Sequence, residues 1–253
     1  MSLFFIDLFV FILGLILGSF FNVVGLRVPK KQSIIYPGSH CTSCQKTLNW
    51  YELIPVISYI ALKGKCRNCS VKISIIYPLF ELATGILFLL SFLHFGWQIE
   101  TLIGWALISL IIIIFISDIH YMIIPDKVLL FFLPVFILLR VFDPLSPWWD
   151  SLLGAFIGFG TLLLIAIISK GAMGGGDIKL FFVLGYLLGL KAIILTFALA
   201  SLIGAVFGIS MMSMKRYGKR QPIPFGPFIG IGSILAFFYT QEIIDWYFNT
   251  FFW

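Results

Sequence analysis

Apolar stretches long enough to cross a bilayer recur along the whole chain and constrain its fold more than any other feature. A transmembrane helix needs about 20 apolar residues. We count eight such segments, of which the fourth and sixth are short, at residues 3–25, 75–93, 99–117, 127–142, 150–169, 178–189, 190–212 and 226–240. A mean hydropathy of +1.08 with only 11% charged residues excludes an ordinary soluble domain. The sequence therefore predicts an all-α polytopic membrane protein with about eight transmembrane helices.

The basic residues predict how these segments are oriented. Eight Lys or Arg residues lie between Arg27 and Lys72, against the single acid Glu52. With both chain ends outside, 15 of the 17 basic residues fall on the cytoplasmic side and only Arg140 and Lys191 lie outside, as the positive-inside rule requires. The net charge of +6 is then explained by topology and by contact with the anionic lipid bilayer, so no nucleic-acid partner is expected. The cytoplasmic set includes four residues after the seventh segment, Lys215, Arg216, Lys219 and Arg220.

All four cysteines lie in the one large polar loop, as two C-x2-C pairs separated by 21 residues: Cys41, Cys44, Cys66 and Cys69. This spacing is close to that of a tetrathiolate zinc site. A cytoplasmic loop favours reduced thiolates over two disulfides, and a closed four-sulfur site leaves no open position for catalytic water. The loop is too small for a large core, so we predict that a structural zinc ion (Zn2+) helps this small cytoplasmic insertion to fold. We expect His40 to lie beside the site rather than to bind the metal.

Two aspartates lie at the ends of apolar segments. Asp177 follows three glycines, Gly174, Gly175 and Gly176, and Asp118 ends the third segment. A charge at membrane depth is costly, so such acids are candidates for a functional site. The glycines let the backbone leave helical geometry and let a second chain approach closely. The predicted topology places both aspartates at the cytoplasmic boundary, where they can meet.

Two adjacent carboxylates share a proton, because both cannot easily ionise at once. Such a pair can activate water with one carboxylate and protonate a leaving amine with the other. Asp118 lies at the C-terminal end of its predicted helix, whereas Asp177 lies at an N-terminus, where negative charge is favoured. We therefore hypothesise a membrane-embedded aspartyl enzyme in which Asp177 is the base and Asp118 begins protonated.

Some of these acids could instead have a structural role. Asp177 could cap a helix beginning at Ile178, and Asp126, between a proline and an apolar run, is typical of a helix start. Asp118 has no such explanation, because an aspartate near a C-terminus stabilises no helix. Glu81 lies inside the second segment, where an unpartnered carboxylate is expensive, so we predict a polar role for it within the bundle.

Several motifs, in collinear order over most of the chain, resemble those of one family. The family is the prepilin peptidases, or type IV leader peptidases, which are membrane aspartyl proteases of the GxGD type. The resemblance rests on the paired cysteines and on Gly18-Ser19-Phe20-Phe21-Asn22-Val23-Val24 with Arg27 and Pro29, Glu52 to Tyr59, Tyr77-Pro78-Leu79-Phe80-Glu81-Leu82, Asp118 to Asp126, Gly174-Gly175-Gly176-Asp177 and Pro224-Phe225-Gly226-Pro227.

The resemblance implies an aspartic endopeptidase that removes the short basic leader from type IV prepilins or pseudopilins, in systems that serve pili, protein secretion or competence. It implies that Asp118 and Asp177 are catalytic, on the cytoplasmic face of the bacterial cytoplasmic membrane. Many members also N-methylate the new amine with S-adenosylmethionine. Glu81, Asn22 and Arg27 are then candidates for a substrate or methylation role. No glycine-rich turn after a strand indicates a methyl-donor site, so methylation rests on the resemblance alone.

Two other function classes share some of these features. A proton-coupled membrane transporter could use intramembrane acids as a relay, but no clear inverted repeat relates the halves of the chain. A noncatalytic scaffold held by zinc would not need either aspartate. The predicted organisation is a first transmembrane helix at residues 1–26, a zinc-binding cytoplasmic loop at 27–74 and a transmembrane peptidase core at 75–253.

Overall fold

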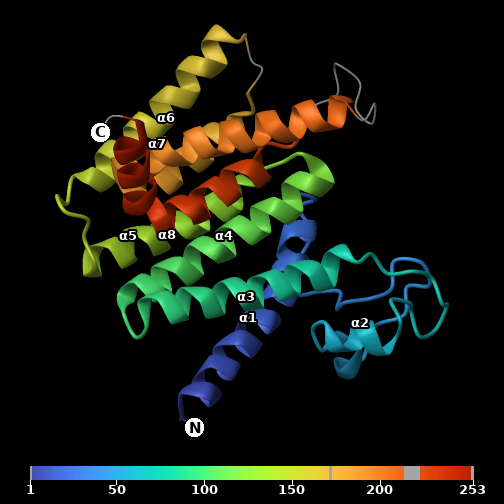
Figure 1. The fold of residues 1–253 in the computed structure, drawn as a ribbon. Helices are drawn as coiled ribbons and strands as arrows, with labels where there is room; N and C mark the ends of the chain where they lie inside the picture. Colours follow the sequence, from blue (N-terminus) through green and yellow to red (C-terminus); the bar gives the residue numbers. More distant parts are fainter. Residues whose placement is uncertain (1, 171–172, 214–222, 252–253) are drawn as a thin grey trace. The chain divides into compact units, whose positions relative to one another are not determined.

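The computed structural model of the chain describes residues 2–170, 173–213 and 223–251 (Figure 1). These residues form no β-strand, and only two isolated bridges occur, both in the cysteine loop. The predicted all-α class is therefore confirmed. The four basic residues after the seventh segment, Lys215, Arg216, Lys219 and Arg220, lie outside the described residues. The elements are α1 (Ser2–Arg27), the 3-10 helix η1 (Trp50–Leu53), α2 (Ile57–Ala61), α3 (Ile76–Phe95), α4 (Ile99–Tyr121), α5 (Asp126–Phe142), α6 (Asp150–Ile168), α7 (Gly175–Ser213) and α8 (Gly226–Phe251).

Six of the described helices are long and apolar enough to cross a membrane, judged by length and composition: α1, α3, α4, α6, α7 and α8. The remaining long helix, α5, is also apolar but has 17 residues, which is slightly short for a span of about 20. All eight predicted segments lie on helices, and the boundaries agree within a few residues except at α8, which extends beyond residue 240. The chain is therefore a multi-pass membrane protein.

Helix α7 contains two of the predicted segments, because its backbone reverses at Gly189. This residue has φ 81° and ψ 178°, a conformation that only glycine adopts readily. The rings of Phe181 and Phe197 have centroids 6.3 Å apart, whereas 16 residues of straight helix would separate them by about 24 Å. The two halves of α7 therefore lie antiparallel, which explains why eight apolar segments occupy seven long helices.

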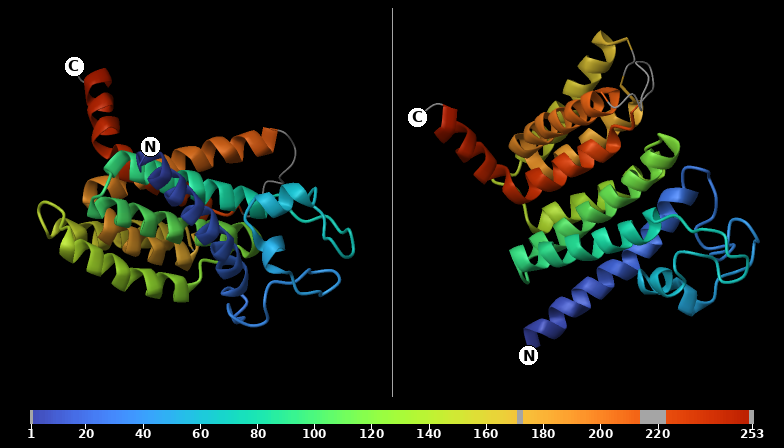
Figure 2. Two further views of the ribbon diagram at one scale, coloured as in Figure 1. Left: turned by 90° about the horizontal axis from the view of Figure 1, so that it is seen from below. Right: turned by 45° about the vertical axis from the view of Figure 1, so that its right-hand side comes forward.

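The chain forms two compact units, Met1–Ile116 and Ser117–Trp253, which we describe separately. In the first unit α1 packs on α3 through small residues. A Cβ atom on Gly14 would lie 2.8 Å from the Cα of Gly85, and one on Gly18 would lie 2.9 Å from the Cα of Glu81. Such close helix packing through small residues is typical of membrane interiors. The cysteine loop leaves the end of α1 and returns to the start of α3 (Figures 1 and 2).

In the second unit α6 and α7 approach most closely at two glycines. A Cβ atom on Gly154 would collide with the carbonyl oxygen of Gly185, and a Cβ atom on Gly185 would collide with the carbonyl oxygen of Gly154.

The reversal of α7 is held by hydrogen bonds from two neighbouring helices. Arg140 of α5 donates a hydrogen bond from Nε to the carbonyl of Leu187 at 2.8 Å, and Asp150 of α6 accepts one from the N–H of Leu190 at 3.2 Å.

Candidate active site and metal centre

Asp118 lies in the last turn of α4, within the second unit, and is only 6% exposed. Its Oδ2 atom accepts a hydrogen bond of 2.8 Å from the backbone N–H of Gly226, the first residue of α8. A Cβ atom on Gly226 would lie 2.8 Å from the same oxygen, so a glycine is needed for this approach. The sequence indicated only the C-terminal end of α4 beside Asp118. The structure adds the N-terminal end of α8, whose free N–H groups attract negative charge.

Asp177 lies at the start of α7, in the same unit. The helix begins at Gly175, so Asp177 is its third residue and the alternative in which it caps a helix beginning at Ile178 is wrong. Its carboxylate accepts a hydrogen bond from the backbone N–H of Gly174, and its own N–H donates to the carbonyl of Gly174 at 3.1 Å. This exchange resembles a capping box. Gly176 lies against Ile124, because a Cβ atom there would be 2.8 Å from the Cβ of Ile124.

The fold brings the two predicted aspartates together. They come from the end of α4 and the start of α7, and their carboxylates are close enough to interact electrostatically. Asp118 is buried and Asp177 is partly buried. Each carboxylate accepts a backbone N–H at the beginning of a helix. Two carboxylates held in this way can divide the roles of base and acid in a hydrolysis.

An ion pair beside Asp177 was not predicted from the sequence. Lys179 Nζ lies 2.9 and 2.8 Å from the two carboxylate oxygens of Asp126, and both side chains are more than half exposed. Asp126 occupies the first turn of α5, as its predicted place at a helix start requires. The sequence held a signal for this pair, because Lys179 and Asp126 lie at the same predicted boundary of the membrane and carry opposite charges.

The four cysteines lie in the first unit, in two turns that repeat one another. The backbone N–H of Cys41 bonds to the carbonyl of Lys46, and that of Cys66 bonds to the carbonyl of Val71, 25 residues further along in each case. Bridges join His40 to Thr47 and Lys65 to Lys72, and the equivalent residues Gln45 and Ser70 both have φ 57°. The C-x2-C pairs are thus presented by two copies of the same tight turn.

The sulfur atoms of the four cysteines fit a single metal ion. They lie within 4.8 Å of one another, all four thiols are free, and the Sγ atoms of Cys41 and Cys69 are 3.7 Å apart. In a tetrahedral site with Zn–S bonds of about 2.3 Å, two sulfurs are about 3.8 Å apart. His40 is not part of this group and instead contacts the carbonyl of Gly38 at 2.9 Å. The alternative of two disulfides is therefore wrong, the predicted reduced thiols are confirmed, and the cluster can hold a metal.

The thiols differ in how easily they lose a proton. The backbone N–H of Lys46 and then the side chain of Asn68 lower the pKa of Cys44 to about 6. The N–H of Val71 lowers the pKa of Cys69, but desolvation and the neighbouring cysteines outweigh it and raise that pKa to about 11. A metal ion binds thiolates, so its binding must displace the proton of Cys69.

Arg27 and Glu81 hold the cysteine loop to the helices of the first unit. Arg27 donates from its guanidinium to the carbonyls of Ser33, Pro37 and Gly38 at 3.1, 2.7 and 3.3 Å. The carboxylate of Glu81 accepts a hydrogen bond of 2.8 Å from the N–H of Val56. Val56 has a positive φ of 61°. These two contacts hold the two arms of the cysteine loop.

Glu81 and Asn22 belong to a polar cluster between α1 and α3. Glu81 also accepts a hydrogen bond from the side chain of Ser19, so the predicted polar role within the bundle is matched by two partners. Asn22 is 5% exposed and donates to the carbonyls of Gly18 and Tyr77 at 3.3 and 3.2 Å. Its Oδ1 atom is buried and accepts no hydrogen bond from the residues that the structure describes.

Comparison with known proteins places the chain among peptidases. Residues 12–95 match the Bacterial Peptidase A24 N-terminal domain, and residues 105–209 match the Type IV leader peptidase family. The chain is 47% identical over 237 residues to a protein of Bacillus subtilis (strain 168) named Prepilin leader peptidase/N-methyltransferase, covering 94% of this chain and 96% of the relative.

More distant relatives carry the same name. A protein of Aeromonas salmonicida (strain A449) is 31% identical, with 95% of this chain and 93% of the relative covered. One of Neisseria gonorrhoeae is also 31% identical, with 93% and 92% covered. No solved structure matches the chain. These matches give no support to a proton-coupled transporter.

Proposed function

The chain belongs to the type IV leader peptidase family, and on that premise we propose that it is a membrane-embedded aspartyl endopeptidase that removes the leader peptide of type IV prepilins or pseudopilins. The observation that carries this proposal is the meeting of Asp118 and Asp177 in one unit, each bonded to a backbone N–H at the start of a helix. Two acids brought together from distant parts of the sequence are typical of a catalytic pair.

In the proposed reaction Asp177 accepts a proton from a water molecule whose oxygen attacks the scissile carbonyl carbon. Asp118 gives its proton to the leaving nitrogen as the C–N bond breaks. Gly174 and Gly226 keep the two carboxylates in place through their N–H groups and leave space that a side chain would occupy. The stretch Gly174–Gly176 also allows the substrate backbone to approach Asp177 closely.

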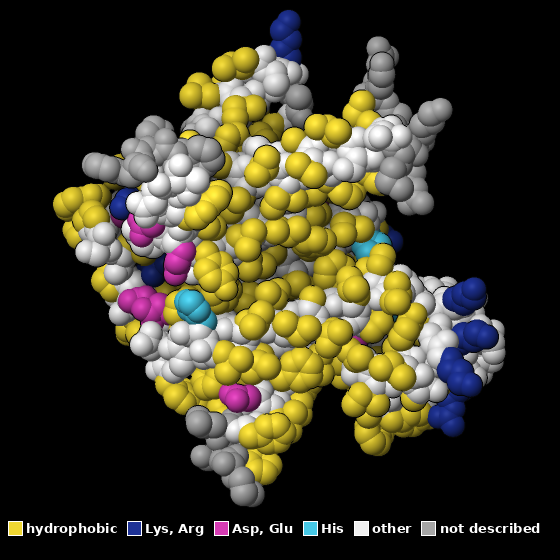
Figure 3. Space-filling model, in the orientation of Figure 1, with side chains coloured by type: hydrophobic (Ala, Val, Ile, Leu, Met, Phe, Trp, Pro, Cys, Tyr) yellow, Lys and Arg dark blue, Asp and Glu magenta, His cyan; other side chains and the backbone are white. Residues whose placement is uncertain are grey.

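We propose that the site faces the cytoplasm from the bacterial cytoplasmic membrane. The support is the distribution of basic residues, which gather over the surface of the cysteine loop in the first unit (Figure 3). Since a basic leader is not attracted to a basic loop, we assign its recognition to the acid pair Asp118 and Asp177. Glu81, in the first unit, is a separate candidate for this role. The division into a first helix (1–26), a loop (27–74) and a core (75–253) is part of this proposal.

We propose that the ion held by Cys41, Cys44, Cys66 and Cys69 is zinc, in a structural role. All four ligands come from the protein, so no position is left for a reacting water molecule. The surrounding loop buries few residues besides Cys41 and Cys66, and a loop with so little core depends on its metal for a defined fold.

The proposal includes N-methylation of the new N-terminus. S-adenosylmethionine would supply the methyl group, and an amine has to be held while receiving it. Asn22 fits this task in one respect, because its buried Oδ1 atom receives no hydrogen bond from the described part of the chain, and Glu81 provides a carboxylate in the same pair of helices. Arg27 serves instead to hold the loop, since its guanidinium is already bonded to three carbonyls.

The intact mass of a prepilin co-expressed with the enzyme tests the proposal. We expect loss of the leader with wild type, and at least a hundredfold less product with Asp118→Asn or Asp177→Asn, since a positioned acid or base contributes about 10²–10⁴-fold. The addition of one methyl group to the product would support the second activity. Cleavage that persists in both variants, in a host without another such peptidase, would contradict the catalytic pair.

A further inference from the structure

The hydroxyl of Ser117, the residue before Asp118, is bonded to a carbonyl beyond the end of its own helix. Its Oγ atom donates a hydrogen bond of 2.5 Å to the carbonyl of Ile123, six residues ahead, and Ser117 is fully buried, with 0% exposed. Serines inside helices commonly donate to a carbonyl three or four residues before them, as Ser233 of α8 does to Gly230 at 2.9 Å. Ser117 instead holds the chain that follows α4.

The bond from Ser117 closes a turn between α4 and α5 that needs support. Met122 has φ 54°, a left-handed conformation that a residue with a side chain seldom adopts unless its surroundings hold it there. Its N–H donates to the carbonyl of Asp118 at 2.8 Å, and the next residue, Ile123, receives the hydroxyl of Ser117. The two bonds together fix the direction in which the chain leaves Asp118.

The turn fixed in this way lies against the glycines at the start of α7. A Cβ atom on Gly176 would be 2.8 Å from the Cβ of Ile124 and 3.6 Å from its carbonyl oxygen, so Ile124 packs directly on Gly176. Ile124 follows Ile123, the residue that Ser117 holds. A short path of contacts within the second unit thus joins Ser117 to Gly176, and these two residues directly precede the two aspartates in the sequence.

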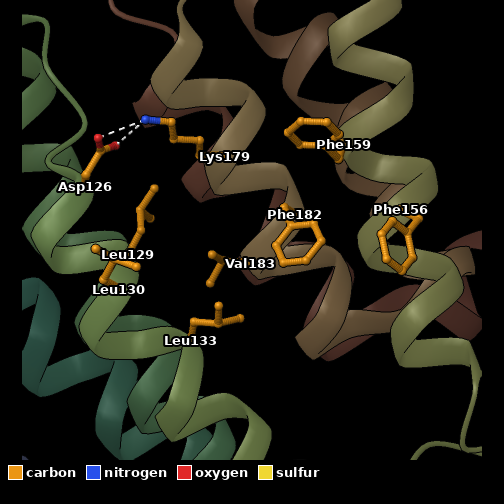
Figure 4. A pocket seen from close by; sticks show the side chains of 9 residues that line it. All are labelled: Asp126, Leu129, Leu130, Leu133, Phe156, Phe159, Lys179, Phe182 and Val183. Carbon is orange, nitrogen blue, oxygen red and sulfur yellow. Dashed lines mark hydrogen bonds and ion pairs between the residues drawn. The ribbon is translucent and has the colours of Figure 1, made fainter.

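An exposed ion pair also joins the two helices that meet here. Asp126, the first residue of α5, is paired with Lys179 near the start of α7 (Figure 4). Both side chains are more than half exposed, so water and salt weaken this pair. Ser117 by contrast is fully buried, and a low local dielectric strengthens a hydrogen bond. The bond from Ser117 therefore constrains the turn more than the ion pair does.

We propose that Ser117 is a positioning residue that sets the separation of Asp118 and Asp177. The inference rests on the proposed function, in which the two carboxylates divide the roles of acid and base. The hydroxyl keeps the turn against Gly176, and the turn keeps the start of α7 at a fixed distance from the end of α4. Two carboxylates share a proton only while they are close together, and a displacement of about 1 Å can cost about a hundredfold in rate. Ser117 therefore acts on the reaction through the aspartates.

A comparison of Ser117→Ala with Ser233→Ala tests this role. Both serines are 0% exposed and lie in the second unit, and each variant loses one hydroxyl hydrogen bond. We expect similar losses in thermal midpoint, but only Ser117→Ala should lower kcat for prepilin by about tenfold or more, with KM unchanged. Ser117→Cys, which keeps a weak S–H donor, should recover part of the lost kcat. Equal kcat in the two alanine variants, or no recovery with cysteine, would overturn the proposal.

The pH dependence of kcat separates positioning from a loss of stability. The interaction of two nearby carboxylates pushes their apparent pKa values apart, so a pair that has moved apart should titrate over a narrower range. We expect the bell-shaped profile of kcat to narrow from both sides in Ser117→Ala and to keep its width in Ser233→Ala. The other charged groups near the helix ends, His120 and the Asp126–Lys179 pair, are the same in both variants. An unchanged width in Ser117→Ala would mean that the serine is structural only, and the proposal would be wrong.

Wild-type activity distinguishes the failure of this proposal from the failure of the proposed function. If wild type cleaves prepilin and the two alanine variants behave alike, the positioning role alone is wrong. If wild type leaves prepilin uncut, the proposed function fails and the positioning role fails with it.

Discussion

The metal centre and the aspartate site are assembled by different means. The four cysteines lie within 29 residues of one another, counted inclusively from Cys41 to Cys69, and their turns are closed by backbone hydrogen bonds inside the loop. Asp118 instead meets Gly226, which is 108 residues away, and reaches Asp177 only because long helices pack together. We therefore expect the loop to depend on a bound metal and the aspartate site to depend on helix packing. Damage to one should therefore leave the other intact.

Removal of the metal should have the largest effect and should be confined to the loop. Structural zinc contributes about 10–16 kcal/mol of binding free energy in small domains that fold around it. We expect a chelator, or Cys66→Ser, to expose the loop to protease while Asp118 and Asp177 still hydrolyse prepilin. His40→Ala is the matched control and should retain the metal, since His40 is outside the sulfur cluster. Metal content and limited proteolysis check this, and peptidase activity that disappears together with the metal would contradict the separation.

A methyl group at the contact between α6 and α7 should damage the aspartate site from a distance. Gly154→Ala places a Cβ atom against the backbone of Gly185, and overpacking of this kind costs about 1–3 kcal/mol. We expect a lower thermal midpoint and reduced cleavage with an unchanged metal content. Gly160→Ala on the same helix meets nothing within 4 Å and should be neutral or slightly stabilising. Equal behaviour of the two variants would show that this contact does not hold the site.

The affinity for metal should fall as the pH falls. Cys69 has a pKa of about 11, so its thiol is protonated at neutral pH and metal binding there must release that proton. The affinity for metal then changes about tenfold per pH unit for each proton released. Cys44 has a pKa of about 6, so below that pH its thiol is protonated as well, and the affinity should fall more steeply with pH. A competition titration between pH 5 and pH 8 measures the slope. An affinity independent of pH would mean that the cysteines are not the ligands.

The sequence predicted the parts of the molecule that depend on local pattern. Hydrophobic runs located the helices, including the two segments that meet at Gly189, and the cysteine spacing predicted one cluster. The pattern could not predict which residues from separate helices and loops contact one another, because helix packing decides those contacts. The N–H of Gly226 beside Asp118, the contact of Glu81 with Val56 and the use of Arg140 to hold the reversal of α7 all join residues from separate elements. The glycines before Asp177 indicated non-helical backbone, whereas α7 already begins among them, at Gly175.

The ion pair between Asp126 and Lys179 should have the smallest effect. Both side chains are more than half exposed, and exposed pairs contribute about 0.2–1 kcal/mol. We expect Lys179→Met, which keeps the apolar stem and removes the charge, to lower the stability of the second unit by no more than this. A double-mutant cycle with Asp126→Asn isolates the pair from other effects of each change. A coupling energy above about 2 kcal/mol would mean that charge as well as helix packing holds the start of α7, and with it Asp177, in place.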